Sequence, residues 1–268
     1  MRPRIDVVIL AWNDGERLDD AVVLALMSEG VDTEVVVVDN GSVLPVSMVD
    51  PRVRVLRNEV NRGVAPARNQ GVRATDSVLV CLLDSDARLA PGCLREMASA
   101  MDDPAVAVTV PVFAGQDASA SAGLAPTLGR KLLRLCNVRD DYAEVPQVPR
   151  SPSWDVDFGI GACQLIRRSA FDSVGGLDER YFYGPEDVDF CLRLCSAGWG
   201  VRQVRDACCA HPPRRHSRGL LTRRGLAHAG AVMHHLWRHR GSIRVRDRVT
   251  RDGAVRLSRP SVGRSATP

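Results

Sequence analysis

The sequence predicts an α/β fold in which a mostly parallel sheet is flanked by helices. Four short runs in the first third of the chain are almost entirely apolar and have the length of strands, at residues 5–10, 34–38, 53–56 and 78–83. Helical apolar spacing separates them at residues 16–28 and 65–73. Strands that are apolar on both faces belong in a parallel sheet covered by helices, and the alternation indicates β-α-β units.

The rest of the predicted domain is less regular. A helix near residues 91–101 and a strand at 105–110 continue the pattern. Residues 112–153 are rich in small residues and proline, which predicts a long loop of the kind that forms lids or binding loops. Within residues 156–166 a strand is expected after two glycines, and a short helix at 167–174 completes the expected elements before the next helix.

Residues 184–195 predict a helix whose first turn carries three carboxylates, those of Glu186, Asp187 and Asp189. Pro185 suits the first helical position and Gly198 offers an end. Two interpretations of the acids remain open. They either complement the helix dipole or place a general base at a site.

Polar clusters follow three of the predicted strands, at the point where each strand ends. They are residues 11–15, 39–42 and 84–88. In an open α/β sheet the ligand crevice lies outside the carboxyl ends of the strands. We therefore expect these three segments to build one ligand site.

Several single residues have two interpretations each. Asp84 and Asp86 suit a Mg²⁺ or Mn²⁺ site, or else form a surface turn. Asp39 could accept an N–H of a nucleobase or cap the next turn. Arg68 could meet a phosphate or be an exposed helix charge. His211, which precedes two prolines, is either a loop residue or a metal ligand.

Charge is divided unevenly along the 268 residues. Residues 1–210 carry 22 Lys and Arg against 30 Asp and Glu, whereas residues 211–268 carry 14 against 2. We predict one domain at 1–211 and a basic tail at 212–268, with a helix at about 220–237 and a disordered end. The tail either contacts an anionic partner, such as a membrane surface, a phosphorylated acceptor or nucleic acid, or is a solvated extension.

Composition narrows the cellular setting. The eight cysteines lie mostly in apolar runs without a CxxC pair, which predicts reduced core thiols in a cytoplasmic protein. The first apolar run is too short for the core of a signal peptide, and no apolar segment has membrane-spanning length. We expect a soluble protein, or one held peripherally on the inner face of a membrane.

Taken in order, the motifs of residues 5–211 resemble those of the family 2 glycosyltransferases of GT-A fold, with the rhamnosyltransferase-like members closest in motif style. The matching stretches are Val7–Asn13, Val37–Ser42, Asn61–Gly71, Leu82–Asp86, Gly161–Arg168, Gly175–Glu179 and Glu186–Asp189. The resemblance implies an inverting transfer of a sugar from a nucleoside diphosphate sugar to an acceptor hydroxyl, assisted by Mg²⁺ or Mn²⁺. The acceptor would be a saccharide, a lipid-linked molecule or a small molecule.

The resemblance also implies a role for each matching residue. Asp187 would be the catalytic base, and Glu186 would support it. Asp84, Asp86 and His211, which lies 24 residues after Asp187, would hold the metal. The residues implied for nucleotide binding are Ala11, Asn13, Asp39, Asn40, Arg68 and Ser85. Those implied for sugar or acceptor contact are Asp157, Gly161 and Asp189, of which Asp189 could instead hold the loop.

The main alternative function is a catalytically silent nucleotide-sugar binding protein that is recruited through its basic tail. A nucleotidyltransferase is disfavoured because residues 13–15 do not form the Gly-rich phosphate loop expected after its first strand. Nucleic acid is the partner that we expect least.

Overall fold

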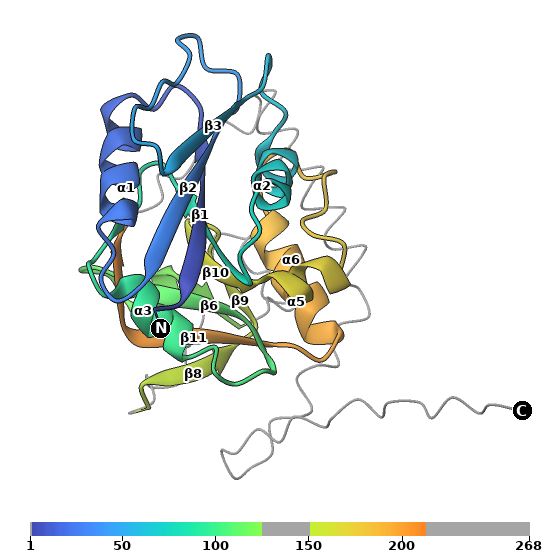
Figure 1. Cartoon of the computed structure of the whole chain (residues 1–268). Coiled ribbons are helices and arrows are strands. Elements are labelled where there is room, and N and C mark those ends of the chain that lie inside the picture. The colour runs from blue at the N-terminus through green and yellow to red at the C-terminus, as the bar shows by residue number, and fades with distance from the viewer. Residues whose placement is uncertain (1, 125–150, 213–268) are drawn as a thin grey trace, which may run out of the picture.

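The computed structural model of the chain describes residues 2–124 and 151–212, and these residues form one large mixed sheet with helices on both faces (Figure 1). The strand order in that sheet is β3-β2-β1-β4-β10-β6-β11-β5, and β8 pairs with β11 beside this path. The tail beyond residue 212, including the helix predicted at 220–237, lies outside the described residues.

The first half of the sheet is parallel, as the sequence predicts. β1 (Arg4–Ala11) lies between β2 (Asp32–Asp39) and β4 (Leu79–Asp84), and β3 (Val53–Arg57) forms the edge beside β2. The apolar side chains of β1, β2 and β4 are buried on both faces, which explains why these strands have no polar face. The parallel direction brings the ends of β1, β2 and β4 to one edge of the sheet.

The second half of the sheet contains strands of both directions. β10 (Cys163–Arg167) runs antiparallel to both β4 and β6 (Val106–Phe113), and β11 (Gly200–Ala210) is parallel to β6. β5 (Arg88–Leu89) and β8 (Ser153–Val156) pair antiparallel with β11. A second, small sheet joins β7 (Ala122–Gly123) to β9 (Phe158–Gly159). The strand predicted after two glycines within residues 156–166 is confirmed as β10, and a turn at 160–162 separates it from the short strand β9.

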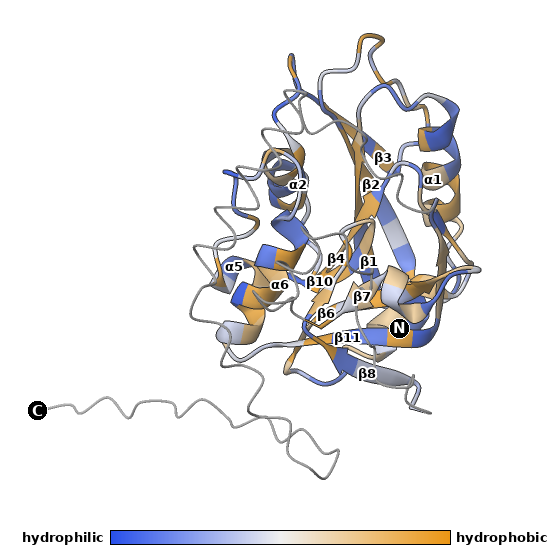
Figure 2. Ribbon diagram, turned by 180° about the vertical axis from the view of Figure 1, so that it is seen from behind, coloured by the Kyte–Doolittle hydropathy of each residue, from blue (hydrophilic) through white to orange (hydrophobic). Residues whose placement is uncertain are grey.

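Helices cover both faces of the sheet. α1 (Glu16–Leu26) and α3 (Cys93–Ser99) lie on one side, and α2 (Val64–Arg73), α5 (Arg168–Ser173) and α6 (Glu186–Ser196) lie on the other (Figures 1 and 2). The apolar strands between them are the core that both layers share (Figure 2). α6 starts at Glu186, with Pro185 one position before it rather than at the first helical position.

The segment predicted as one long loop at 112–153 is more ordered than expected where the structure describes it. β6 continues to Phe113, and a 3₁₀ turn, η1 (Ala118–Ala120), leads into β7. The seven cysteines of the described ranges are free thiols. Within the same ranges, no helix has both the length and the apolar character needed to cross a bilayer.

Candidate active site

The polar clusters that follow β1 and β2 are joined by hydrogen bonds at the carboxyl edge of the sheet. The backbone N–H of Asn13 donates to Oγ of Ser42 at 3.0 Å, and Oδ1 of Asn13 accepts the backbone N–H of Val43 at 2.9 Å. The amide Nδ2 of Asn40 donates to the carbonyl of Gly63 at 3.1 Å, which ties the start of α2 to the same edge. Ala11 ends β1 in the buried layer beneath this loop network.

Asp39 is fully buried, and its carboxylate is used by the chain itself. Oδ1 accepts the backbone N–H of Ser42 at 2.9 Å, Oδ2 accepts that of Val46 at 3.1 Å, and the guanidinium of Arg57 forms an ion pair with Oδ2. Burial alone would raise the pKa of Asp39, but these hydrogen bonds together lower it. Asp39 therefore shapes the loop at residues 40–46 and is fully buried, and the nucleobase contact implied by the resemblance stays a prediction.

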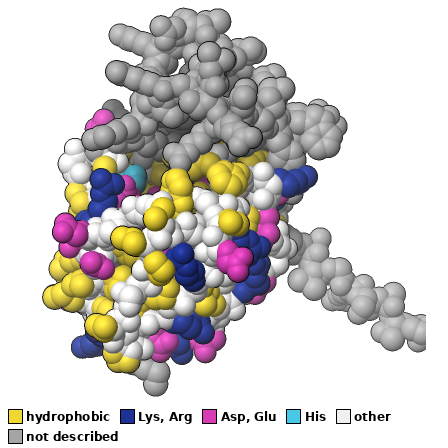
Figure 3. Space-filling model, turned by 90° about the horizontal axis from the view of Figure 1, so that it is seen from above, with side chains coloured by type: hydrophobic (Ala, Val, Ile, Leu, Met, Phe, Trp, Pro, Cys, Tyr) yellow, Lys and Arg dark blue, Asp and Glu magenta, His cyan; other side chains and the backbone are white. Residues whose placement is uncertain are grey.

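A group of three potential metal ligands lies beside this network. One ligand atom each from Asp84, Asp86 and His211 lies within 4.8 Å of the others. Nε2 of His211 is 3.4 Å from Oδ1 of Asp86, and that hydrogen bond is the main cause that lowers the pKa of Asp86, while burial opposes it. Seen from above, a histidine side chain lies beside acidic side chains on the surface (Figure 3). Two carboxylates and an imidazole are a donor set that suits Mn²⁺ or Mg²⁺.

His211 is held in place by residues that the sequence did not single out. The ring of Phe113, at the end of β6, lies 5.1 Å from the imidazole between centroids. Nε2 of Gln116 donates to the backbone carbonyl of His211 at 2.7 Å.

Ser85, between the two aspartates, is buried, and its carbonyl accepts a hydrogen bond from Arg88 at 3.1 Å.

The acidic start of α6 is buried against the turn before β10. Oδ2 of Asp187 accepts the backbone N–H of Gly161 at 2.9 Å. Oε1 of Glu186 accepts a hydrogen bond from Nη1 of Arg68 at 3.3 Å, whereas its buried Oε2 has no hydrogen-bond partner among the described residues. Burial, followed by the charge of Asp187, raises the pKa of Glu186 to about 7, and Arg68 opposes this rise.

Asp189 is held by the side chains of Arg193 and Tyr181. Its side chain is fully buried, with Oδ2 2.7 Å from Nε of Arg193 and the hydroxyl of Tyr181 3.4 Å from Oδ1. Arg193 also donates to the carbonyls of Val174 and Gly176, at 2.7 and 2.8 Å. Of the two roles that the sequence left open for Asp189, the geometry supports the structural one.

Arg68 and Asp157 complete the sequence-predicted set. Arg68 is a buried arginine bound to Asp84 and Glu186, not an exposed helix charge. Asp157 is half-buried between β8 and β9, and its backbone N–H donates to the carbonyl of Gly123 at 3.0 Å. The sequence analysis did not identify Arg57 as a site residue. Its position could have indicated it, because Arg57 is the last residue of β3 and lies at the same edge of the sheet as the polar clusters.

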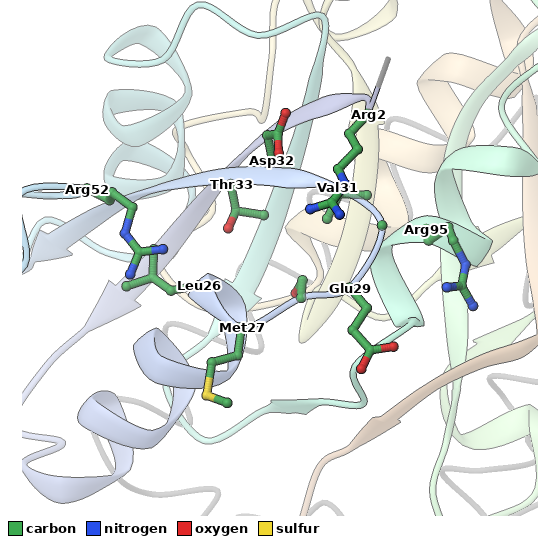
Figure 4. A pocket seen from close by; sticks show the side chains of 11 residues that line it. Arg2, Leu26, Met27, Glu29, Val31, Asp32, Thr33, Arg52 and Arg95 are labelled. Carbon is green, nitrogen blue, oxygen red and sulfur yellow. The ribbon is translucent and has the colours of Figure 1, made fainter.

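A separate hollow lies at the opposite, amino-terminal edge of the sheet (Figure 4). It has a volume of about 690 Å³ and is lined by residues around the turn between α1 and β2, together with Arg2, Arg52 and Arg95. Arg52 is paired with Asp50 and Arg95 with Glu96, so most of the positive charge that lines the hollow is already neutralised. None of the predicted site residues lines it.

The comparisons with known proteins agree with this fold. The sequence profile of glycosyl transferase family 2 matches residues 6–175, and the chain belongs to that family. The fold is the GT-A fold that the sequence motifs predicted.

Two of the relatives that we compare come from Mycobacterium tuberculosis. The chain is 34% identical over 195 residues to a pre-mycofactocin glycosyltransferase, covering 71% of this chain and 40% of that protein. It therefore spans about 40% of the length of that relative. It is also 28% identical over 279 residues to an N-acetylglucosaminyl-diphospho-decaprenol L-rhamnosyltransferase, covering 94% of this chain and 91% of the relative.

Solved structures share the fold at low sequence identity. A mannosyltransferase from Pyrobaculum calidifontis, in complex with GDP-Man and Mn²⁺, has a TM-score of 0.57 at 18% identity and covers 81% of this chain and 59% of its own. GalNAc-T7 with UDP, GalNAc and Mn²⁺ has a TM-score of 0.59 at 17% identity and covers 78% of this chain and 44% of its own.

Proposed function

We propose that this protein is an inverting glycosyltransferase that moves a sugar from a nucleoside diphosphate sugar to an acceptor hydroxyl. The observation that carries the proposal is the meeting of Asp84, Asp86 and His211 at the sheet edge, with the first of them joined through Arg68 to the acidic start of α6. A metal-ligand set next to a buried pair of carboxylates is what a metal-assisted displacement with a general base requires.

The residues that would hold a divalent cation are Asp84, Asp86 and His211. The cation would be Mn²⁺ or Mg²⁺, and when bound it would stabilise the negative charge of a diphosphate leaving group. The solved relatives in complex with Mn²⁺ and either a nucleotide sugar or a nucleotide support this choice of ligand class.

Asp187 is the residue that we propose as the proton acceptor. The N–H of Gly161 fixes the direction of its carboxylate, so the base keeps one orientation as the acceptor oxygen attacks the anomeric carbon. Glu186, the neighbouring buried carboxylate, supports it through its hydrogen bond to Arg68. A single displacement of this kind inverts the anomeric centre.

The acceptor class follows only from relatives. The similarity to an enzyme that modifies a decaprenol-linked diphosphosugar, over 94% of this chain, makes a lipid-linked saccharide the acceptor to test first. Saccharides and small molecules are the other two classes.

The first experiment is a thermal-shift panel of UDP-, dTDP- and GDP-sugars, with and without Mn²⁺, followed by an assay for release of the nucleoside diphosphate. We expect one donor to raise Tm only when Mn²⁺ is present, because a ligand that binds the folded state stabilises it. Asp86→Ala should abolish the shift, whereas Asp32→Ala, an exposed carboxylate at the opposite edge, should leave it intact.

Three results would distinguish the transferase from the catalytically silent binding protein. Donor binding with release of the diphosphate supports the transferase. Donor binding without turnover on any acceptor favours the catalytically silent binding protein. The absence of binding by every nucleotide sugar contradicts both.

A further inference from the structure

Arg68 is the residue that joins the two halves of the candidate site. It lies on α2, and its side chain is only 4% exposed. Nη2 donates to Oδ1 of Asp84 at 2.5 Å and to the carbonyl of Gly161 at 2.7 Å, and Nη1 donates to Oε1 of Glu186 at 3.3 Å. One guanidinium therefore contacts the end of β4, the turn before β10 and the start of α6.

Gly161 makes this close approach possible. A Cβ atom at this position would lie 2.5 Å from Nη1 of Arg68, which is closer than real contacts allow. The same residue donates its backbone N–H to Asp187 at 2.9 Å while its carbonyl accepts from Arg68. Arg68 is thus connected to Asp187 through a single residue.

The charges around Arg68 are arranged to keep it in place. Burial disfavours an isolated cation, but Asp84 and Glu186 both contact the guanidinium and raise the pKa of Arg68 above its ordinary value. The planar fork of a guanidinium binds several acceptors in one plane, which a lysine cannot do. Nε of Arg68 is buried as well and has no hydrogen-bond partner among the described residues.

This geometry does not suit a residue that reaches out to a diphosphate. Three of the five N–H groups of the guanidinium donate to protein acceptors, and the side chain is only 4% exposed, so a phosphate could reach Arg68 only if the residues around it moved. The sequence had left a phosphate contact as one of two roles for this residue.

We propose that Arg68 is a positioning residue that holds Asp84 and the acidic start of α6 in a fixed relation, and that it acts through Asp84, Glu186 and Gly161 rather than by contact with the donor. The proposal rests on the proposed function, since it assigns Asp84 to the metal and α6 to the proton transfer. It predicts that the loss of Arg68 uncouples binding from turnover.

The test compares Arg68→Met, Arg68→Lys and Gly161→Ala with wild type, and uses Arg73→Met as the matched control. Arg73 lies on the same helix, but its side chain is 62% exposed and pairs with Glu179. In Arg68→Met we expect kcat to fall about 100-fold, as for a small misplacement of reacting groups, while the Kd of the donor with Mn²⁺, measured by calorimetry, changes less than about threefold. Arg68→Lys, which keeps the charge but loses the fork, should recover only part of kcat.

Gly161→Ala covers the case in which Arg68→Met does not fold. It keeps the guanidinium but displaces it, so kcat should fall while donor affinity stays near that of wild type. A rise of about 30-fold or more in donor Kd for Arg68→Lys, with kcat retained, would show a phosphate contact and overturn the proposal. So would wild-type kcat in both Arg68→Lys and Gly161→Ala.

Amide hydrogen exchange separates this proposal from the proposed function. The exchange of the Gly161 amide and of residues 186–189 should become faster in the Arg68 variants and stay unchanged in Arg73→Met, whether or not any donor is turned over. Unchanged exchange in Arg68→Met would overturn the positioning role. Absence of turnover by the wild type would instead contradict only the proposed function.

Discussion

Replacing Glu186 by glutamine should change how the stability of the protein depends on pH. Burial, together with the charge of Asp187, raises the pKa of Glu186 from 4.5 to about 7 in the folded state. The folded protein therefore holds this proton more tightly than the unfolded chain does. The wild type should lose stability as pH rises from about 4.5 to about 7 and then level off. A glutamine has no proton to lose, and its amide oxygen can still accept the hydrogen bond of Arg68.

The size of the effect follows from the two pKa values. A change from 4.5 to about 7 corresponds to roughly 3 kcal/mol, at about 1.4 kcal/mol for each tenfold change in proton affinity. The Glu186 side chain is only 8% exposed, so solvent screening reduces this free-energy difference only a little. At pH 8 the variant should be more stable than wild type by up to this amount, and near pH 4 the two should be almost equal.

The assay is urea unfolding at a series of pH values from 4 to 8, with a chelator present so that no cation occupies the site. Glu59→Gln, at an exposed position, is the matched control and should follow the wild type at every pH. If Glu186→Gln also follows the wild type throughout this range, the raised pKa of Glu186 and the electrostatic account of the buried acid pair are wrong.

Three further substitutions test other parts of the site. Asp86→Ala should weaken Mn²⁺ binding by at least about tenfold, because it removes one of the three proposed ligands. The affinity is measured from the electron paramagnetic resonance signal of unbound Mn²⁺, and an unchanged affinity would exclude this metal site. Gly41→Ala should destabilise the fold by about 1–3 kcal/mol in urea, since Gly41 has φ +81° and an added Cβ would lie 2.6 Å from the carbonyl carbon of Val60; a neutral result would show that the loop can move. Arg193→Met should cost about 3 kcal/mol or more of unfolding free energy because it removes the cation that pairs with the buried carboxylate of Asp189, and a loss below about 1 kcal/mol would contradict the structural role of this ion pair.

The parallel half of the fold could be predicted because its signals are local. Runs of apolar residues identify β1, β2 and β4, and the polar residues that follow each run mark the edge where the site forms. The direction of β10 could not be predicted in this way. Its apolar residues would look the same in a parallel or an antiparallel central strand.

One group of the candidate site, the three potential metal ligands, could be predicted from the sequence, but the hydrogen bonds within the site could not. The ordered motifs, and not any one spacing, brought Asp84, Asp86 and His211 together. The partners of Arg68 lie 16, 93 and 118 residues away along the chain, so no periodicity points to them. For the same reason the sequence could not show that Asp39 forms an ion pair with Arg57, which lies 18 residues later.

We propose that Asp187 takes the proton from the acceptor in a sugar transfer. Its most direct test is Asp187→Asn, assayed for transfer and, in parallel, for donor binding by calorimetry in the presence of Mn²⁺. We predict a loss of at least about 100-fold in kcat, with the donor Kd and the unfolding midpoint close to those of wild type. Full turnover by Asp187→Asn would contradict this assignment of the base.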